Sequence, residues 1–176
     1  MTLPPGLFGR RIYIQDDSPG ARVYLRRGDY PPLTIGDRVQ VTGKVDDYHG
    51  ELEIVVNDPS GMILLGKGAV PAPRRIATGQ VNEAVEGRLV WVFGRVAKYE
   101  SAAWIIDDGS GPTRVYFPDD LPWRRPFVQI GEMWAVQGVV GQYVSQRPYV
   151  GGYRLIPRLA TDVGPPPAFL PVTGGD

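Results

Sequence analysis

The sequence lacks cysteine, and it contains a single histidine, His49, and only three lysines in 176 residues. Without cysteine there can be no disulfide, no thiolate metal site and no thiol nucleophile. A single histidine cannot supply the histidine pair that many metal sites use. We therefore predict that the chain is not an enzyme and that it carries no catalytic residue, no cofactor and no metal.

The chain also has no net charge, because 19 lysines and arginines balance 19 aspartates and glutamates. No field of the whole molecule attracts nucleic acid or anionic lipid, so any such binding must be local. Nearly all the positive charge is arginine, whose planar head suits forked phosphate contacts and stacking on aromatic rings. No run approaches the roughly 18 apolar residues of a transmembrane helix, so we expect no membrane span in this chain.

What the sequence does contain is an internal repeat. Three blocks occur in the same order in both copies: 13–20, 22–24 and 35–43, then 104–111, 114–116 and 130–138. Tyr48 and Tyr143 each stand five residues past the last glycine of their copy. Repetition with the order preserved indicates two copies of one small domain.

Alternating apolar and polar residues predict short strands in both copies. The expected strands are 11–15, 22–25, 38–45 and 51–56, then 88–96, 103–107, 113–117, 132–140 and 153–156. Five short strands, a glycine within a long strand and a longer connection between the third and fourth strands are typical of an OB-fold barrel. The predicted fold is all-β, with two consecutive five-stranded OB-fold-like barrels; a generic sandwich is the alternative.

The composition divides the chain into a first OB-fold-like domain (1–66), a linker (67–77), a second OB-fold-like domain (78–163) and a proline-rich tail (164–176). The first barrel is expected to lack most of its first strand, because Pro4-Pro5-Gly6 interrupts the residues ahead of its second strand. An open barrel exposes unpaired backbone groups along an edge. Either the chain is excised from a longer protein, or Phe169-Leu170 or self-association with a neighbouring molecule fills the gap.

Two stretches resemble a known arrangement. Residues 36–45, followed by Tyr48-His49-Gly50-Glu51-Leu52, resemble the OB-like domains of bacterial extracellular nucleases and lamin-tail surface proteins. Residues of the second copy resemble the second domain of the same tandem: 78–81, 86–90, 107–111 and 153–158. The resemblance implies an extracellular or cell-surface bacterial protein whose nuclease chemistry resides in a separate domain.

The tail contains Leu170-Pro171-Val172-Thr173-Gly174, which matches the sortase sorting pentapeptide. This resemblance implies a sortase as partner, cleavage between Thr173 and Gly174, and attachment of the threonine to the cell envelope. The apolar span and basic tail that follow this motif in its family are absent from Gly174-Gly175-Asp176. The alternative is an unstructured proline-rich end.

OB barrels commonly bind oligonucleotides or oligosaccharides on the face of their second and third strands and the flanking loops. If Ile12 and Val23 point inward, alternation turns their neighbours outward, and aromatic rings beside arginines are what base stacking and phosphate neutralisation require. Arg10, Arg11, Arg27 and His49 add to this face. The predicted nucleic-acid-binding residues are Tyr13, Arg22, Tyr24, Arg26, Tyr48, Trp104, Arg114, Tyr116, Tyr143, Arg147 and Tyr149.

Each of these predictions has a plainer alternative. Exposed aromatics also stabilise cross-strand pairs, and contacts between the two domains could cover them. The carboxylate pairs Asp16-Asp17 and Asp107-Asp108 lead into turns, where aspartate caps backbone amides. The hypothesis is a non-catalytic tandem OB-fold module that binds single-stranded nucleic acid or oligosaccharide; the alternative is a structural spacer or protein-interaction module.

Overall fold

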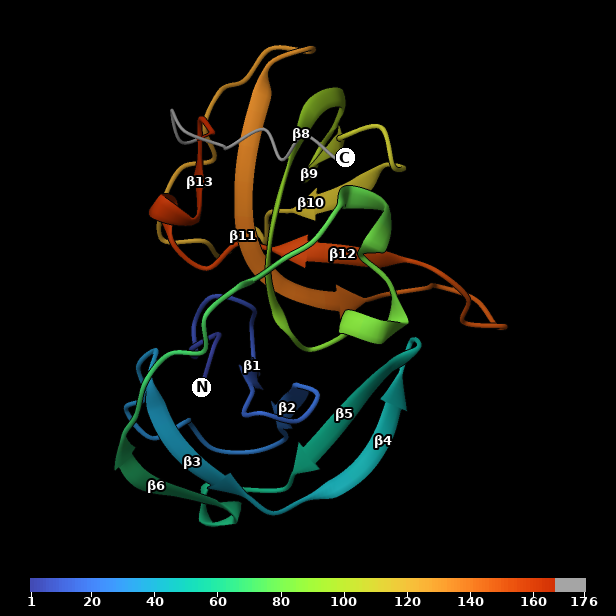
Figure 1. The fold of residues 1–176 in the computed structure, drawn as a ribbon. Helices are drawn as coiled ribbons and strands as arrows, with labels where there is room; N and C mark the ends of the chain where they lie inside the picture. The colour runs from blue at the N-terminus through green and yellow to red at the C-terminus, as the bar shows by residue number, and fades with distance from the viewer. Residues whose placement is uncertain (167–176) are drawn as a thin grey trace.

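The structure is a computed structural model that describes residues 1–166. The described residues form strands and short 3-10 turns, with no α-helix among them, so the predicted all-β class is confirmed. The chain folds into two halves that lie one against the other (Figure 1). No helix in residues 1–166 has the length and apolar character needed to cross a membrane. Phe169 and the motif residues Leu170, Pro171, Thr173 and Gly174 lie outside the described residues.

The second half is a closed five-stranded barrel. Its strands are β8 (Leu89–Glu100), β9 (Ala103–Asp107), β10 (Thr113–Tyr116), β11 (Met133–Gln142) and β12 (Tyr153–Ile156). They follow the order β8-β9-β10-β12-β11, and β11 pairs again with β8 to close the ring. The pairing of β10 with β12 is parallel, whereas the others are antiparallel. This half has the five-stranded barrel that the sequence predicts.

Shorter elements surround this barrel. The strand β7 (Arg74–Arg75) lies parallel to β8, and β13 (Val163–Gly164) pairs with β11. The 3-10 turns η2 (Thr78–Gln80) and η3 (Glu83–Val85) precede β8, and η4 (Ala160–Asp162) precedes β13. Residues 67–77, predicted as a linker, therefore run from the end of the first half to β7, which pairs with β8 of the second half.

The first half is not closed. The strands β1 (Arg11–Ile14), β2 (Ala21–Leu25), β5 (Glu51–Val56) and β4 (Lys44–Tyr48) form one sheet in that order. After the turn η1 (Pro59–Gly61), the strand β6 (Met62–Lys67) pairs with β3 (Asp37–Val41) in a separate two-stranded sheet. A closed barrel is thus confirmed for the second half, whereas two consecutive barrels are not confirmed, because the first half shows an open arrangement.

The place of the missing strand is visible by comparison with the second half. There, β8 lies between β9 and β11, and Val96 exchanges hydrogen bonds with 131–132: its amide donates to the Glu132 carbonyl (2.9 Å) and its carbonyl accepts from Gly131 (2.8 Å). In the first half, the Met1 amine donates to the Asp37 carbonyl (2.7 Å) and the Met1 carbonyl accepts from Gly36 (3.1 Å). Met1 therefore takes the place in the first half that Val96 of β8 holds in the second half.

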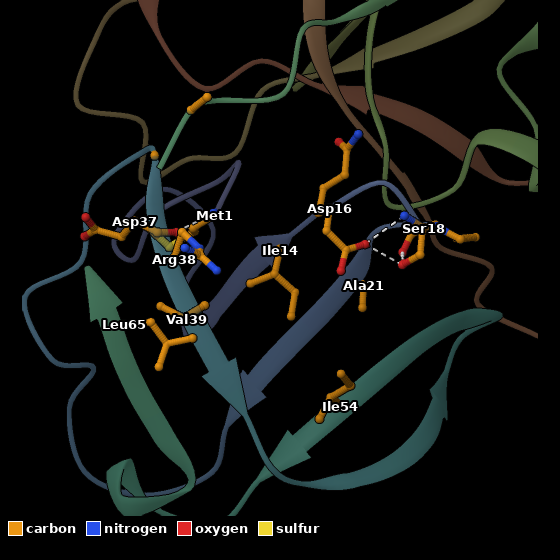
Figure 2. A pocket seen from close by; sticks show the side chains of 14 residues that line it. Met1, Ile14, Asp16, Ser18, Ala21, Asp37, Arg38, Val39, Ile54 and Leu65 are labelled. Atoms are coloured by element: carbon orange, nitrogen blue, oxygen red, sulfur yellow. Dashed lines mark hydrogen bonds between the residues drawn. The ribbon is translucent and has the colours of Figure 1, made fainter. Parts of the chain in front are cut away.

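A hollow of about 430 Å³ opens where the rest of that strand would lie. Figure 2 shows that side chains from β1, β3, β5 and β6 face this space. Most of them are apolar: Ile14, Val39, Ile54 and Leu65. The hollow is a gap in the wall of the first half.

Around their first turns the two copies correspond with an offset of 92 residues. This offset is one residue longer than the one between 13–20 and 104–111 that the repeat in the sequence suggests. The Asp16 carboxylate accepts hydrogen bonds from the Ser18 amide (2.8 Å) and hydroxyl (2.5 Å) (Figure 2), and Asp108 makes the same pair of bonds to Ser110 at 3.0 and 2.5 Å. Asp16 thus corresponds to Asp108 rather than to Asp107.

This offset overturns one predicted site residue. With it, Trp104 corresponds to Ile12, and both face equivalent valines across the strand pair: Ile12 is opposite Val23, and Trp104 is opposite Val115. Trp104 is fully buried in the core of the second half. The prediction that Trp104 points outward is wrong because a shift of one residue along a strand moves a side chain to the opposite face.

The two halves share a hydrophobic cluster. It consists of Leu3, Leu7, Tyr13, Leu89, Val139 and Ile156, drawn from both halves. Tyr13 and Arg22 face away from the core of the first half, as alternation predicts, but the second half covers them and both are buried. At Gly141 of β11 the approach is so close that an added Cβ would lie 2.7 Å from the Tyr13 hydroxyl. Tyr13 and Arg22 are therefore part of the interface between the halves.

Candidate nucleic-acid interface

A hollow of about 230 Å³ lies at the junction between the halves. Strands β1, β2 and β4 bring residues to it from the first half, and β10 and β12 bring residues from the second. We call it the junction pocket. Its lining is Phe8, Arg11, Arg22, Tyr48, Tyr116, Tyr143 and Arg154. Unlike the larger hollow in the first half, it combines arginine with aromatic side chains, and so we take it as the candidate site.

The guanidinium groups of the pocket lie against its aromatic rings. The Arg154 head is 4.5 Å from the ring centre of Tyr116 and 5.3 Å from that of Tyr143. The Arg11 head is 5.1 Å from the centre of Tyr48, and the Arg22 head is 4.3 Å from the same ring. Such cation–π contacts hold planar cations in place without using their hydrogen-bonding edges.

Arg22 is the buried base of the pocket, with a side chain that is 1% exposed. Its Nη1 donates to the Glu51 carboxylate at 2.6 Å, and its Nε lies 2.7 Å from Glu53 Oε2 as an ion pair. The Tyr13 hydroxyl donates to the other Glu51 oxygen at 2.6 Å. Burial, followed by the nearby Glu51 charge, raises the pKa of Tyr13, which therefore remains a donor. The Nη2 of Arg22 has no hydrogen-bond partner.

Arg11 and Arg154 differ from Arg22 because no carboxylate lies within ion-pair distance of either, as far as residues 1–166 show. The Nε atom of each is buried without a hydrogen-bond partner. Burial lowers the pKa of Arg154, which reports the cost of holding this cation away from water. An anion placed between the two heads would offset that cost through its charge.

A row of aromatic rings begins at the edge of the pocket and continues along two loops. Tyr48 and His49 are 4.6 Å apart between ring centres, His49 and Tyr143 are also 4.6 Å apart, and His49 and Tyr149 are 5.7 Å apart. Arg147 lies over the Tyr149 ring at 4.7 Å. We call Tyr48, His49, Tyr143 and Tyr149 the aromatic row. It offers ring surfaces at the edge of the pocket.

The row forms because the two loops are bonded to each other. The turn between β4 and β5 reaches the second half (Figure 1), where the Val144 amide donates to the His49 carbonyl at 3.0 Å. The His49 Nδ1 lies 2.8 Å from the Val144 carbonyl. Tyr48 and Tyr143, which hold the same place in their copies, are thereby brought to 6.3 Å between ring centres. The residues predicted to form two separate binding faces, one in each copy, therefore meet at the junction between the halves.

Most of the predicted site residues gather at this junction, and some do not. Arg22, Tyr48, Tyr116 and Tyr143 line the pocket, and Tyr24 lies against Arg11 at its edge. Arg147 and Tyr149 extend the row. Tyr13 is buried beneath the pocket, Trp104 is in a core, Arg26 is exposed past the end of β2, and Arg114 pairs with Glu100.

The site residues that sequence reasoning did not select are Phe8 and Arg154. Arg154 is brought beside the junction by the parallel pairing of β10 with β12, in which it lies opposite Arg114. The same pairing in the first half sets Arg22 opposite Glu53. An arginine therefore stands where the first copy has a carboxylate, a difference that only the pairing register reveals.

The paired carboxylates have roles in turns. Asp107 accepts from the amides of Gly109 and Gly111, and Asp108 accepts from Ser110 and Thr78. Burial by itself would raise the pKa of Asp108, but the hydrogen bonds from Ser110 and Thr78 outweigh it and lower the value to about 2. Within residues 1–166, no cluster of three or more histidines or carboxylates is placed to hold a metal ion.

Comparison with known proteins gives one related sequence. The chain is similar to Endonuclease YhcR of Bacillus subtilis (strain 168), with 31% identity over 164 residues. The match covers 86% of this chain but 13% of that protein, so the chain spans a small part of its relative. No family model matches the chain.

Two solved structures show a distant likeness. A chain of the S. pombe Stn1-Ten1 complex is 16% identical, covers 57% of this chain and 83% of its own length, and has a TM-score of 0.42. An OBody bound to hen egg-white lysozyme is 17% identical, with coverages of 51% and 92% and a TM-score of 0.38. At such TM-scores, neither likeness carries an argument about fold or function.

Proposed function

We propose that this chain is a non-catalytic module that binds single-stranded nucleic acid at the junction of its two halves. The observation that carries the proposal is the junction pocket, where Arg11 and Arg154 lie among aromatic rings and no carboxylate of residues 1–166 is within ion-pair distance of either. Phosphates would contact these two arginines, and bases would stack on Tyr143 and Tyr149 in the aromatic row.

The similarity to a protein named as an endonuclease favours a nucleic acid over an oligosaccharide as the ligand. The zero net charge of the chain means that affinity must come from a few local contacts. Stacking contributes roughly 1 to 3 kcal/mol per base, so a short row of rings with two free arginines gives weak, salt-sensitive binding.

Fluorescence anisotropy with labelled single-stranded oligonucleotides, at low and moderate salt, tests the proposal. We expect saturable binding that weakens as salt rises, and weakens further when Tyr143→Ala is combined with Tyr149→Ala. Tyr99→Ala is the matched control, because Tyr99 is a partly exposed tyrosine on β8 that belongs to neither the pocket nor the row. Absence of saturable binding at low salt would reject nucleic acid as the ligand. Cleavage of the oligonucleotide in the presence of divalent cations would contradict the non-catalytic part.

A spacer or protein-interaction module is the second candidate function. It is favoured by the hydrophobic cluster that the two halves share, because such a cluster makes the tandem a stiff body. The same titration separates the candidates, and an oligosaccharide ligand would appear as binding of glycans but not of oligonucleotides.

Location and assembly complete the proposal. Leu170, Pro171, Thr173 and Gly174 would direct the protein to the cell envelope through a sortase, and mass spectrometry of envelope-derived protein would then find a chain that ends at Thr173. Self-association would use the open side of the first half. Light scattering of the purified chain should then give the mass of a dimer, whereas a monomeric mass would remove this part of the proposal.

A further inference from the structure

We propose that the junction pocket holds the terminal phosphate of a single strand, so that the module anchors a phosphorylated end. The inference rests on the proposed function and adds the chemical class of group that the pocket selects. It is carried by the arginines of the pocket, by its size and by its continuity with the aromatic row.

The arginines provide the donors. Arg22 lies at the base, and Arg11 and Arg154 stand beside it with no carboxylate of residues 1–166 within ion-pair distance. Both carboxylates of the cluster, Glu51 and Glu53, are taken up by Arg22. Three guanidiniums against two carboxylates leave a net positive charge at the pocket. Planar guanidiniums with free edges form forked hydrogen bonds to phosphate oxygens.

The size of the pocket favours one group rather than a whole nucleotide. Its volume is about 230 Å³, which is below the roughly 300 to 1,000 Å³ of pockets that enclose a drug-sized ligand. Its walls come from both halves, with Phe8 and Tyr48 from the first half and Tyr116 and Tyr143 from the second. A hollow of this kind accepts a group at the end of a chain more readily than a diester, whose two sugars must both pass the walls.

The charge of a terminal phosphate also fits better than that of a diester. A monoester carries a charge of about −1.5 to −2 near neutral pH and presents three strong acceptor oxygens, whereas a backbone diester carries a single charge. Three acceptors match the three arginines that line the pocket. The burial that lowers the pKa of Arg154 would be offset most by the more highly charged group.

The strand would leave the pocket along the aromatic row. Tyr143 belongs to both, because it lines the pocket and its ring centre is 4.6 Å from that of His49. The first base after the anchored phosphate would therefore stack near Tyr143, and later bases near Tyr149. Recognition of the phosphate by the arginines and stacking of the bases on the tyrosines are contributions of different residues, which makes them separable by experiment.

Competition against a labelled oligo-dT tests the inference, using three unlabelled oligo-dT strands of one length: with a 5′-phosphate, with a 3′-phosphate and with neither. We expect one phosphorylated strand to compete about tenfold better than the unphosphorylated strand, the effect of one or two charge-assisted hydrogen bonds. Arg11→Gln and Arg154→Gln should each abolish this preference, so that phosphorylated and unphosphorylated strands compete equally for the variant. Arg124→Gln, at an exposed arginine away from the pocket, should keep it.

The outcomes separate the inference from the proposed function. Equal competition by all three strands would overturn the inference and leave strand binding intact. If no strand binds but thymidine monophosphate, unlike thymidine, raises the melting temperature, the phosphate pocket stands and strand binding fails. If no strand binds and thymidine monophosphate leaves the melting temperature unchanged, both the inference and the proposed function are overturned. Should a glutamine variant fail to fold, Arg154→Lys keeps the charge without the fork, and we expect it to lose most of the preference.

Discussion

At the scale of single residues, Glu86 is the carboxyl group that the contact between the halves perturbs most clearly. It follows η3, and its Oε1 accepts a hydrogen bond from the Leu52 amide of the first half at 3.3 Å. Its Oε2 is buried without a partner. Burial, and then repulsion from Glu51, raise the pKa of Glu86 from 4.5 to about 7.

This shift makes the stability of the protein depend on pH. Between pH 4.5 and about 7 the folded protein holds a proton on Glu86 that the unfolded chain has lost, so the free energy of unfolding falls as pH rises through this window. Glu86→Gln should remove that fall. One pKa unit corresponds to about 1.4 kcal/mol, and because Glu86 keeps some contact with water we expect a gain of about 1 to 2 kcal/mol near pH 8.

Urea unfolding of the two proteins across this pH range checks the prediction. Asp29→Asn serves as the control, because it removes an exposed carboxylate from a loop and should leave the pH profile unchanged. Parallel stability profiles for the parent and Glu86→Gln would contradict the role given to this side chain.

The residue scale also shows what alternation along a strand can predict. It places Tyr13 and Arg22 on the side of β1 and β2 away from the core of the first half, and the structure agrees. It gives no information on what covers that side, because Leu89 and Val139 arrive there from far along the chain. The buried ion pair of Arg22 with Glu51 and Glu53 depends on the parallel pairing of β2 with β5, which alternation along one strand does not predict either.

At the scale of elements, β11 of the second half packs closely against β1 of the first. A Cβ at Gly141 would lie 2.7 Å from the Tyr13 hydroxyl and 3.0 Å from Glu51 Oε1. Both atoms are held by the hydrogen bond between them and are buried, so neither can move aside freely. Gly141→Ala should therefore destabilise the protein by about 1 to 3 kcal/mol, as overpacking of a core does.

Thermal unfolding of Gly141→Ala beside Gly164→Ala measures this effect. Gly164 is also a strand glycine, in β13, but an added Cβ there meets no atom within 4 Å. We expect a lower melting temperature for the first variant and an unchanged one for the second. Equal melting temperatures would show that β11 and β1 are not packed as closely as described.

Element pairing explains why the fold was more predictable than the site. Period-two patterning and the glycine-containing turns are local, and they correctly predict the strands of the second barrel. The repeated blocks of the sequence pair Asp16 with Asp107, whereas the shared hydrogen bonds to Ser18 and Ser110 show that Asp108 is the counterpart. The sequence alone does not reveal this error of one residue. The error is sufficient to assign Trp104 to the surface, although it lies in the core.

At the scale of the whole molecule, the two halves form a single packed unit. The shared cluster around Tyr13, Leu89 and Ile156 is fully buried, and backbone contacts such as that between His49 and Val144 link the loops. The first half alone has an open side and a smaller core cluster, so it depends on the second half for much of its burial. Cooperative unfolding of both halves follows from this dependence.

Calorimetry should therefore record one unfolding transition whose calorimetric and van't Hoff enthalpies agree, and two separate transitions would show that the halves are independent. Because the junction pocket is lined from both halves, its ligand binds only while they are docked, and it should raise the temperature of that single transition.

Leu3→Ala, which opens a cavity in the shared cluster, should lower the stability by about 2 to 5 kcal/mol. It should weaken ligand binding only at temperatures where unfolding begins, since Leu3 does not line the pocket.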